Sequence, residues 1–468
     1  MPASIVWFRN DLRLADNPAL TAALRSGRPV VPLYILDEET PGLRAAGAAS
    51  RWWLHGSLHM LAASLAKLGS RLILRRGPAR RVIEEIVGEA DAAALYWNRA
   101  YDRSGMARDG EIKQTLERRG LVAEGLKGNL LFEPWQARKP DDTPYKVFTA
   151  FWRACRALPP PGPLLPAPAR LPGPAHWPRS DALDALCLRS SAAADKSDLG
   201  SVWAPGEASA IARLATFVDD GLDRYRLTRD LPGTAGTSRL SPHLAFGEIG
   251  PRQAWRAATA AGLSASTEKF LAELGWREFA YSLLFHLEDP SGQNMRSEFD
   301  SFPWAPGSAS LDAWREGRTG YPIVDAGMRE LAATGWMHNR VRMIVASFLT
   351  KHLLVDWRQG ERWFWESLVD ADPANNAVGW QWVAGSAADA QPYFRVFNPV
   401  LQGEKFDPRG GYVRRWLPEL ASLPDDAVHR PWTAPRPLYV DRYPPPIVDH
   451  AAARQRALEA FRSLKRSA

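Results

Sequence analysis

The chain has 468 residues, of which 46% are hydrophobic and 24% are charged, the composition of an ordinary globular protein. This length predicts two to four domains and allows a large core without disulfides or structural metals. The formal net charge of +7 favours a polyanionic partner. Only two cysteines occur, Cys155 and Cys187, and neither stands in a metal-ligand spacing. An iron–sulfur cluster and a zinc knuckle are therefore excluded, and a disulfide framework is disfavoured.

The sequence also argues against a membrane protein. No apolar run approaches the roughly 18 residues that span a bilayer. Residues 1–4 carry no charged segment followed by an apolar one, so we expect no export signal. We therefore expect a cytoplasmic protein, and because nothing in the pattern requires a second copy, a monomer.

The first 130 residues alternate short apolar runs with helical patterns. The runs lie at residues 5–8, 30–36, 71–74, 93–97 and 121–124. Such alternation with short connections predicts an α/β domain, built on a parallel, five-stranded, Rossmann-like sheet with helices on both faces. No glycine-rich phosphate loop follows any of these runs, so this domain shows no nucleotide-binding motif of its own.

A proline-rich segment separates this domain from a helical one. Residues 159–178 contain nine prolines, which neither a helix interior nor a central strand tolerates. They predict an extended, semi-rigid linker. Beyond residue 205, long amphipathic patterns predict an almost wholly helical half. We expect an α/β domain over 1–130, a linker over 131–204 and a helical domain over 205–468.

Three segments of the helical half carry side chains suited to ligand binding. Residues 236–242 place hydroxyls and an arginine before a helical stretch, which suits either a phosphate site or an ordinary helix cap. Glu273, Trp276 and Arg277 share one helix face, which suits a flat ligand or a solvated surface. Residues 336–343 repeat this geometry, and polar residues on an otherwise apolar helix indicate a lined cavity.

Two further stretches leave alternatives open. Asp370 and Asp372 begin a polar turn that lacks the other ligands of a calcium loop, so hydrogen bonding to an organic ligand is favoured over a metal site. Residues 394–416 interleave basic and aromatic side chains, which suits nucleic-acid contact or a solvated surface.

His338 stands alone, and a lone histidine is more often structural than catalytic.

Taken in order, these segments resemble the DNA photolyases of the photolyase/cryptochrome superfamily over essentially the whole chain. The resemblance is carried by IVWFRNDLRL at 5–14, GTSRLSP at 236–242, WREF at 276–279, TGYPIVDAGM at 319–328, GWMHNR at 335–340, WQW at 380–382 and FNPVLQGEKF at 397–406. It implies an α/β antenna domain followed by an all-α FAD-binding domain. It also implies blue-light-driven repair of cyclobutane pyrimidine dimers in UV-damaged DNA, by electron transfer from reduced FAD to a flipped-out dimer. This is the reaction of a carbon–carbon lyase.

The resemblance assigns roles to individual residues. The FAD contacts would be Tyr225, Thr237, Ser238, Arg239, Leu240, Ser241, Arg277, Asn339, Arg342, Asp370, Asp372 and Asn376. The lesion contacts would be Glu273, Trp276, Arg340, Met343 and Trp382. Trp380, Trp357 and Trp304 would form an electron-transfer triad, and no metal is implied. Glu273 would hydrogen-bond the dimer. Asn376 would face flavin N5 with an uncharged amide, where an aspartate would repel the anionic reduced form. The expected catalytic residues are Glu273, Asn376, Trp304, Trp357 and Trp380.

The alternative function is a cryptochrome-type blue-light photoreceptor that binds FAD without repair. Plant-type cryptochromes commonly carry aspartate where this chain has Asn376, which favours repair. Enzymes for the (6–4) lesion carry histidine where this chain has Asn339, which favours the cyclobutane dimer. Methenyltetrahydrofolate is the expected antenna chromophore, with 8-hydroxy-5-deazaflavin or an empty site as alternatives. Gly105 stands where folate-binding members have glutamate, so no antenna residue is assigned.

Overall fold

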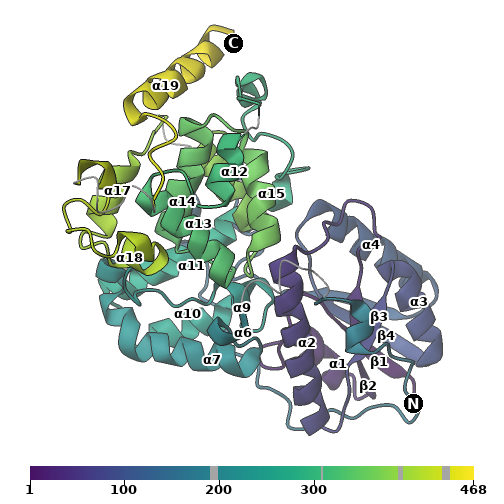
Figure 1. Cartoon of the computed structure of the whole chain (residues 1–468). Coiled ribbons are helices and arrows are strands. Elements are labelled where there is room, and N and C mark those ends of the chain that lie inside the picture. The colour runs from purple at the N-terminus through teal and green to yellow at the C-terminus, as the bar shows by residue number, and fades with distance from the viewer. Residues whose placement is uncertain (190–198, 307–308, 388–393, 435–442, 468) are drawn as a thin grey trace.

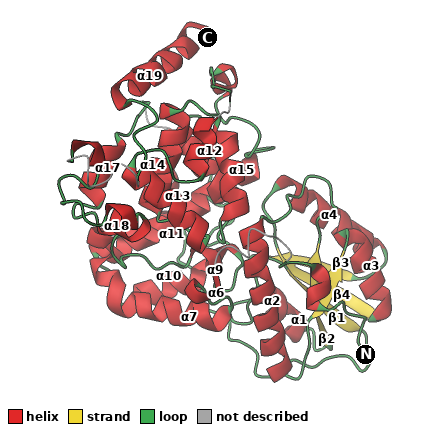
Figure 2. Ribbon diagram, viewed as in Figure 1, coloured by secondary structure: helices red, strands yellow, loops and turns green. Residues whose placement is uncertain are grey.

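The computed structural model describes residues 1–189, 199–306, 309–387, 394–434 and 443–467. An α/β part and a helical part lie side by side, with the C-terminal helix at the end of the molecule far from the sheet (Figure 1). The strands of the described chain gather in the α/β part (Figure 2). The predicted fold class is confirmed.

The sheet is formed by β1 (Ala3–Phe8), β2 (Val30–Leu36), β3 (Ile73–Arg76), β4 (Ala92–Asn98) and β5 (Val122–Leu126). The strands lie in the order β3-β2-β1-β4-β5, and each pair is parallel. β1 and β2 are buried along their whole length, as expected for central strands covered on both faces.

β3 begins two residues later than the apolar run predicted. Its register is set by pairing with β2, from Leu33 opposite Ile73 to Leu36 opposite Arg76. β3 lies at the edge of the sheet, where charged side chains such as Arg76 are tolerated because they reach solvent. Periodicity alone did not show that two arginines extend this strand.

Four helices cover the sheet: α1 (Pro18–Arg25), α2 (Ala48–Lys67), α3 (Ala79–Glu89) and α4 (Arg103–Arg118). Asn17 caps α1, its side chain accepting a hydrogen bond from the backbone N–H of Leu20. Figure 1 shows α2 between the sheet and the helical part. Leu58, Leu65 and Trp53 of α2 are fully buried. His59, Met60 and Ala63 of the same helix are exposed, so one face of α2 packs in the core and the opposite face meets solvent.

The segment between the two parts is only partly a linker. The proline-rich run lies along the α/β part, where Pro172 accepts a hydrogen bond from the backbone N–H of Val30 (2.7 Å) and Leu171 is fully buried. Within the predicted linker, however, α5 (Phe148–Ala157) forms and packs against α11 (Ala265–His286). Phe151 and Cys155 therefore belong to the core of the helical part.

The helical part contains α6 (Leu199–Val202), α7 (Glu207–Thr216), α8 (Tyr225–Thr228), α9 (Ser241–Ala245), α10 (Pro251–Ala260), α11, α12 (Ala309–Arg315), α13 (Pro322–Thr334), α14 (Asn339–Ser347), α15 (Trp357–Ser367), α16 (Pro373–Ala384), α17 (Pro399–Phe406), α18 (Gly411–Trp416) and α19 (His450–Ser467). α15 starts at Trp357 because Asp356 caps it, its side chain accepting from the backbone N–H of Arg358. No helix in the described part of the chain is both long and apolar enough to span a membrane.

One buried carboxylate joins the two parts. Glu248, after α9, accepts hydrogen bonds from Trp53 Nε1 (3.3 Å) and Ser57 Oγ (2.5 Å) of α2. It also accepts from the backbone N–H of Gly206 (2.6 Å), and its Oε2 lies 2.5 Å from His243 Nδ1. Glu248 and His243 are both inaccessible to solvent. The carboxylate therefore satisfies donors from three separate segments.

We expect Glu248→Ala to lower the free energy of unfolding by about 3–5 kcal/mol, because several buried donors lose their acceptor. Urea unfolding followed by circular dichroism measures this loss. Glu85→Ala is the control, since the Glu85–Arg81 pair is exposed and its removal costs no more than about 0.5 kcal/mol. Equal losses in the two variants would contradict the role given to Glu248.

Candidate functional site

A cavity of about 400 Å³ opens between α11, α14, α15 and α16. α16 starts sharply because Pro373 occupies its first turn and Asp372 caps it, accepting from the backbone N–H groups of Ala374 and Asn375. The cap fixes the direction of α16, which carries Asn376, Gly379 and other lining residues.

The five predicted lesion residues meet at this cavity. Glu273, Trp276, Arg340, Met343 and Trp382 all line it. They come from α11, α14 and α16, so the first and last of them, Glu273 and Trp382, lie more than a hundred residues apart in the sequence. The i, i+3 spacing on α11 and α14 turns their members toward the same space.

Four of the predicted FAD contacts also line the cavity: Asn339, Arg342, Asp370 and Asn376. Arg342 Nη2 contacts both oxygens of Asp370 at 3.0 and 2.8 Å, and Arg342 Nε donates to the carbonyl of Met337 (2.8 Å). Asp370 is buried. This ion pair holds a fixed charge pattern on the cavity wall, because each partner orients the other.

Asn376 presents its amide in a defined orientation. Its Nδ2 group donates to Oε1 (2.8 Å) and to the backbone carbonyl (3.0 Å) of Glu361. Both of those atoms only accept, so the amide nitrogen must face them. The carbonyl Oδ1 is left as the polar atom of this side chain that can address a ligand in the cavity.

The cavity rim carries charges that the sequence patterns did not single out. Glu273 is paired with Arg229 and, at 3.0 Å, with Lys269 Nζ. Arg340 Nη2 lies 3.0 Å from Asp230 Oδ1. Lys269 stands four residues before Glu273 on α11, so spacing alone could have found it. Arg229 and Asp230 lie far away in sequence and carry no such signal.

Aromatic and thioether groups form the walls near the rim. Trp276 stacks on Phe148 of α5 with ring centroids 3.7 Å apart and planes inclined by 9°. Arg340 lies over the ring of Phe406 (4.4 Å) and its Nη1 lies 3.8 Å from Met343 Sδ. These contacts hold the flat faces of the walls in place while leaving the side chains half-buried.

The three predicted triad tryptophans, Trp380, Trp357 and Trp304, lie on α16, on α15 and in the segment before α12. Trp380 lines the cavity, and the Cβ that a side chain at Gly360 of α15 would carry falls 2.1 Å from its ring. Trp357 lies one turn before Gly360 on α15 and is fully buried. Trp304 is half-buried, and the backbone N–H of its neighbour Ala305 donates to Leu354 (2.7 Å), just before α15.

The other predicted FAD contacts lie outside the cavity lining. Arg277 donates to the carbonyl of Asn129 (2.9 Å) and lies beside Glu278, whose pKa burial raises to about 7. Asp372 is occupied by its cap and by Tyr281 Oη (2.6 Å). Tyr225 is buried in the core of the helical part, and burial raises its pKa.

The loop that holds Thr237, Ser238, Arg239, Leu240 and Ser241 reaches the cavity wall through Trp336. The Arg239 guanidinium lies between the rings of Trp203 (4.7 Å) and Trp336 (4.6 Å). Trp336 Nε1 donates to Ser241 Oγ (3.1 Å), and the Arg342 guanidinium lies 5.9 Å from the same indole. Arg239 has a φ of 51°, a strained conformation for a non-glycine residue.

His338 has a structural role in this geometry. Its Nδ1 accepts from the backbone N–H of Arg340 (3.2 Å) and caps α14. Burial lowers the pKa of His338 to about 4, so the ring is neutral near pH 7 and can accept that hydrogen bond.

The basic and aromatic stretch 394–416 is only partly a surface. Tyr412 is fully buried and donates to Glu330 (2.6 Å). Arg414 is held by the carbonyl of Leu423 (2.7 Å) and by Asp425 (2.8 Å). Their roles are therefore in packing and folding, and the sequence pattern overstated the number of groups that are free to meet nucleic acid.

Comparison with known proteins gives consistent results over the whole chain. A DNA photolyase model matches residues 4–170, and a model for the FAD binding domain of DNA photolyase matches residues 270–463. The chain is 48% identical over 475 residues to the deoxyribodipyrimidine photo-lyase of Agrobacterium fabrum, covering 99% of this chain and 98% of that protein.

Two further similarities place the chain within this group. The crystal structure of a bacterial class III photolyase from Agrobacterium tumefaciens superposes with a TM-score of 0.95 at 47% identity, covering 100% of this chain and 98% of that one. Cryptochrome-1 of Arabidopsis thaliana is 38% identical over 478 residues, covering 98% of this chain and 70% of that protein.

The groups around the cavity fit a flavin nucleotide. A volume of about 400 Å³ lies within the roughly 300–1,000 Å³ typical of cofactor sites. Asn376 and Asn339 provide amide groups, and the Arg342–Asp370 pair provides both donors and acceptors. The buried Nε of Arg239 lacks a hydrogen-bond partner among the described residues, and a phosphate oxygen would satisfy it.

We expect Gly379→Leu to weaken FAD binding about tenfold or more, roughly 1.4 kcal/mol. Gly379 lines the cavity, and no atom lies within 4 Å of the Cβ that a side chain there would add. Leucine should therefore leave α16 folded and occupy ligand space. The absorbance ratio of FAD to protein and a titration of apoprotein measure the effect.

Gly110→Leu is the matched control, because Gly110 lies in α4 and its Cβ position is equally open. Equal FAD affinity in both variants would show that the cofactor does not occupy this cavity.

Proposed function

The chain belongs to the DNA photolyase family, and we propose that it repairs cyclobutane pyrimidine dimers in DNA under blue light. It acts as a deoxyribodipyrimidine photolyase, a carbon–carbon lyase, with FAD as its cofactor. The observation that carries this proposal is the cavity itself. Its mouth combines two carboxylates, Glu273 and Asp230, with aromatic and thioether walls and a rim of arginine and lysine side chains.

Each part of the mouth suits one part of a flipped-out dimer. Glu273 would accept a hydrogen bond from a pyrimidine imide group, and its pairing with Lys269 and Arg229 fixes where its oxygens point. Trp276 and Trp382 would cover the apolar faces of the two bases and exclude water. The cations on the rim would contact backbone phosphates.

The inner part of the cavity would hold FAD. Asn339, Arg342, Asp370 and Asn376 would bind it from the wall, and the Thr237–Ser241 loop would contact its phosphate-bearing portion. When bound, reduced FAD supplies the light-driven electron that opens the dimer ring. Oδ1 of Asn376 would accept a hydrogen bond from the flavin without adding negative charge beside it.

Trp380, Trp357 and Trp304 would relay electrons between the surface and the cavity. Trp357 Nε1 donates to Asn294 Oδ1 (2.9 Å), which fixes that indole in the middle of the relay. Trp314 also packs against Trp380, with ring centroids 6.2 Å apart, so the first indole of the relay is held within an aromatic cluster.

For the antenna we propose methenyltetrahydrofolate near the boundary between the two parts. The crevice at the carboxyl ends of β1 and β4 is the switch point where ligands of such sheets bind. Here Arg9 and Arg108 pair with Asp109 at 2.8 and 3.0 Å and lie over the Trp7 ring at 4.6 and 4.7 Å. A deazaflavin seated there would have to displace these ion pairs.

Gly105, where folate-binding members have glutamate, lies in the first turn of α4. Its neighbour Arg103 pairs with Glu288 of the helical part, so this turn faces the domain boundary. The absorption spectrum of purified protein tests the proposal: a near-ultraviolet band besides those of flavin is expected. The mass of the extracted chromophore then separates a folate from a deazaflavin, and a pure flavin spectrum would mean an empty site.

We further propose that the protein acts as a monomer in the cytoplasm, where a bacterial DNA-repair enzyme would meet its substrate.

The proposed function is tested by light and dark incubation. The reduced protein is mixed with an oligonucleotide that carries one cyclobutane dimer, and dimer loss is followed under blue light and in darkness. We expect loss only in the light. Equal survival of the dimer in both conditions, in protein that holds FAD, would favour the alternative of a photoreceptor without repair.

We expect Trp380→Phe to slow the photoreduction of oxidised FAD by at least about tenfold, or roughly 1.4 kcal/mol in the barrier. Repair by enzyme that has been reduced chemically beforehand should stay close to wild type, because that assay bypasses the relay. Trp255→Phe, a buried tryptophan of α10, is the control. Full-rate photoreduction in Trp380→Phe would refute the relay.

We expect Arg340→Ala to weaken binding of dimer-containing DNA by about tenfold and to reduce the slope of log affinity against log salt by about 1. The reason is that Arg340 is a cation on the rim of the cavity. Arg80→Ala, which removes an exposed arginine of α3, is the matched control. A slope as steep as that of the control would exclude a phosphate contact by Arg340.

A further inference from the structure

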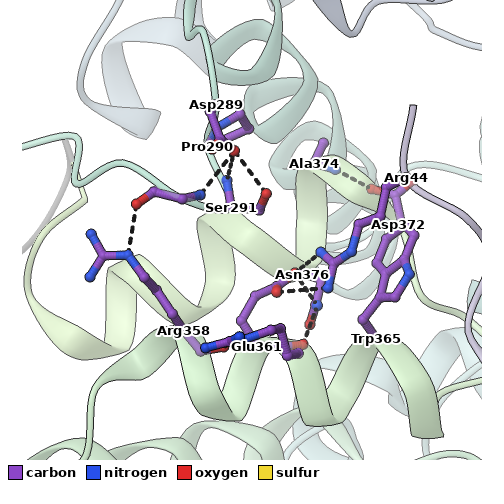
Figure 3. A network of polar contacts seen from close by, with 12 residues as sticks. Arg44, Asp289, Pro290, Ser291, Arg358, Glu361, Trp365, Asp372, Ala374 and Asn376 are labelled. Carbon is purple, nitrogen blue, oxygen red and sulfur yellow. Dashed lines mark hydrogen bonds and ion pairs between the residues drawn. The ribbon is translucent and has the colours of Figure 1, made fainter. Parts of the chain in front are cut away.

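An arginine of the α/β part reaches across the boundary to the helix that supports the cavity. Arg44, in the loop between β2 and α2, contacts Glu361 of α15 with both guanidinium nitrogens, at 2.6 and 3.0 Å. Its guanidinium also lies flat over the ring of Trp365, 4.1 Å from the centroid. Figure 3 shows the three side chains together with Asn376.

The backbone around Arg44 is docked rigidly on the same helix. Trp365 Nε1 donates to the carbonyl of Ala45 (2.8 Å), and Ser50 Oγ donates to the carbonyl of Leu368 (2.9 Å). Gly47 approaches so closely that an added Cβ would stand 2.1 Å from the Trp365 carbonyl oxygen. The position of Arg44 is therefore set by the way the two parts of the chain meet.

Glu361 needs this partner. Only 1% of the residue is exposed to solvent, and a buried carboxylate is costly unless it is paired and hydrogen-bonded. Arg44, whose side chain is 32% exposed, supplies the opposite charge from the solvent side. Asn376 supplies hydrogen bonds from the cavity side. Glu361 thus stands between a cation of one domain and an amide of the other.

Glu361 fixes which atom Asn376 offers to the cavity. Its carboxylate Oε1 and its backbone carbonyl both accept from Nδ2 of Asn376, so Oδ1 is the atom available for a ligand. The Arg44 guanidinium holds both carboxylate oxygens and so orients the carboxylate for this contact.

We propose that Arg44 is a positioning residue for the cavity-facing amide of Asn376 and acts through Glu361. The α/β domain thereby sets the hydrogen-bonding polarity of the flavin site. The proposal rests on the proposed function to the extent that it takes FAD to occupy this cavity.

Loss of the Arg44 charge opposes flavin reduction. The Glu361 carboxylate then lacks its cation and stands one hydrogen bond away from a cavity residue, where its negative charge disfavours an anionic ligand. The reduced form of the flavin is therefore destabilised relative to the oxidised form.

The experiment compares the midpoint potential of bound FAD among variants of the full-length protein by spectroelectrochemistry. We expect Arg44→Gln to disfavour reduction about tenfold per electron, a shift of ~59 mV to more negative potential. Arg44→Lys keeps the charge and should recover most of the shift. Arg51→Gln is the matched control, since Arg51 pairs with Glu38 inside the α/β part and should leave the potential unchanged.

The double variant Arg44→Gln/Glu361→Gln separates this route from a general loosening of the domain boundary. It removes the uncompensated carboxylate but keeps a side-chain oxygen that can accept from Asn376. We expect its midpoint potential to return to within ~18 mV of wild type, which corresponds to about a twofold difference in the equilibrium constant for reduction. A merely structural role of Arg44 predicts no such recovery, because the boundary contact is still missing.

Three outcomes would overturn the proposal. One is a potential in Arg44→Gln equal to that in Arg51→Gln, and a second is a shift that the double variant does not reverse. The third is loss of FAD from both Arg44→Gln and the double variant, because the double variant should retain the cofactor even if Arg44→Gln does not. Failure of the proposed function is a separate result, because absence of light-dependent dimer loss in the wild type leaves the comparison of potentials intact.

Discussion

A buried carboxylate must be compensated by the groups around it, and this constraint fixes how the two parts of the chain meet. Glu248 collects donors from α2, from the start of α7 and from His243. Glu361 is compensated by Arg44 and Asn376. In both cases part of the compensation comes from the α/β part and part from the helical part. The hydrogen bonds and ion pairs at this boundary depend on one relative position of the two parts, whereas an apolar interface of the same area would tolerate small shifts.

The cavity remains open because its walls are held from behind. Trp276 is supported by Phe148 of α5, Arg342 by Asp370, and Glu273 by Lys269. Each of these lining groups thus already has a partner, either behind the wall, as Phe148 is, or beside it on the wall, as Asp370 and Lys269 are, so closing the cavity would break contacts that already exist. The same scaffold serves photolyases and cryptochromes among its relatives. Function within the family must therefore depend on side chains of the site, such as the uncharged amide of Asn376.

Much of the fold could be predicted from the sequence, because it depends on local pattern. Apolar runs marked the strands, prolines marked the extended crossing segment, and long amphipathic patterns marked the helical half. The lesion residues were predicted as a set from the resemblance to DNA photolyases, because spacing along α11 alone left a solvated helix face open as an alternative. Boundaries failed where a distant partner decided them, as at β3, whose register follows β2.

The sequence by itself determined the two-part architecture, because periodicity acts over a few helical turns, and its resemblance to DNA photolyases named the residues of the cavity mouth. Only the tertiary structure brought Arg229 and Asp230 to the rim and Arg44 to Glu361, more than three hundred residues away along the chain. It also showed that Arg277 and Asp372 are occupied by Asn129 and Tyr281. The physical reason is that charge pairing in a protein interior depends on which groups are buried together, and sequence distance carries no information about that.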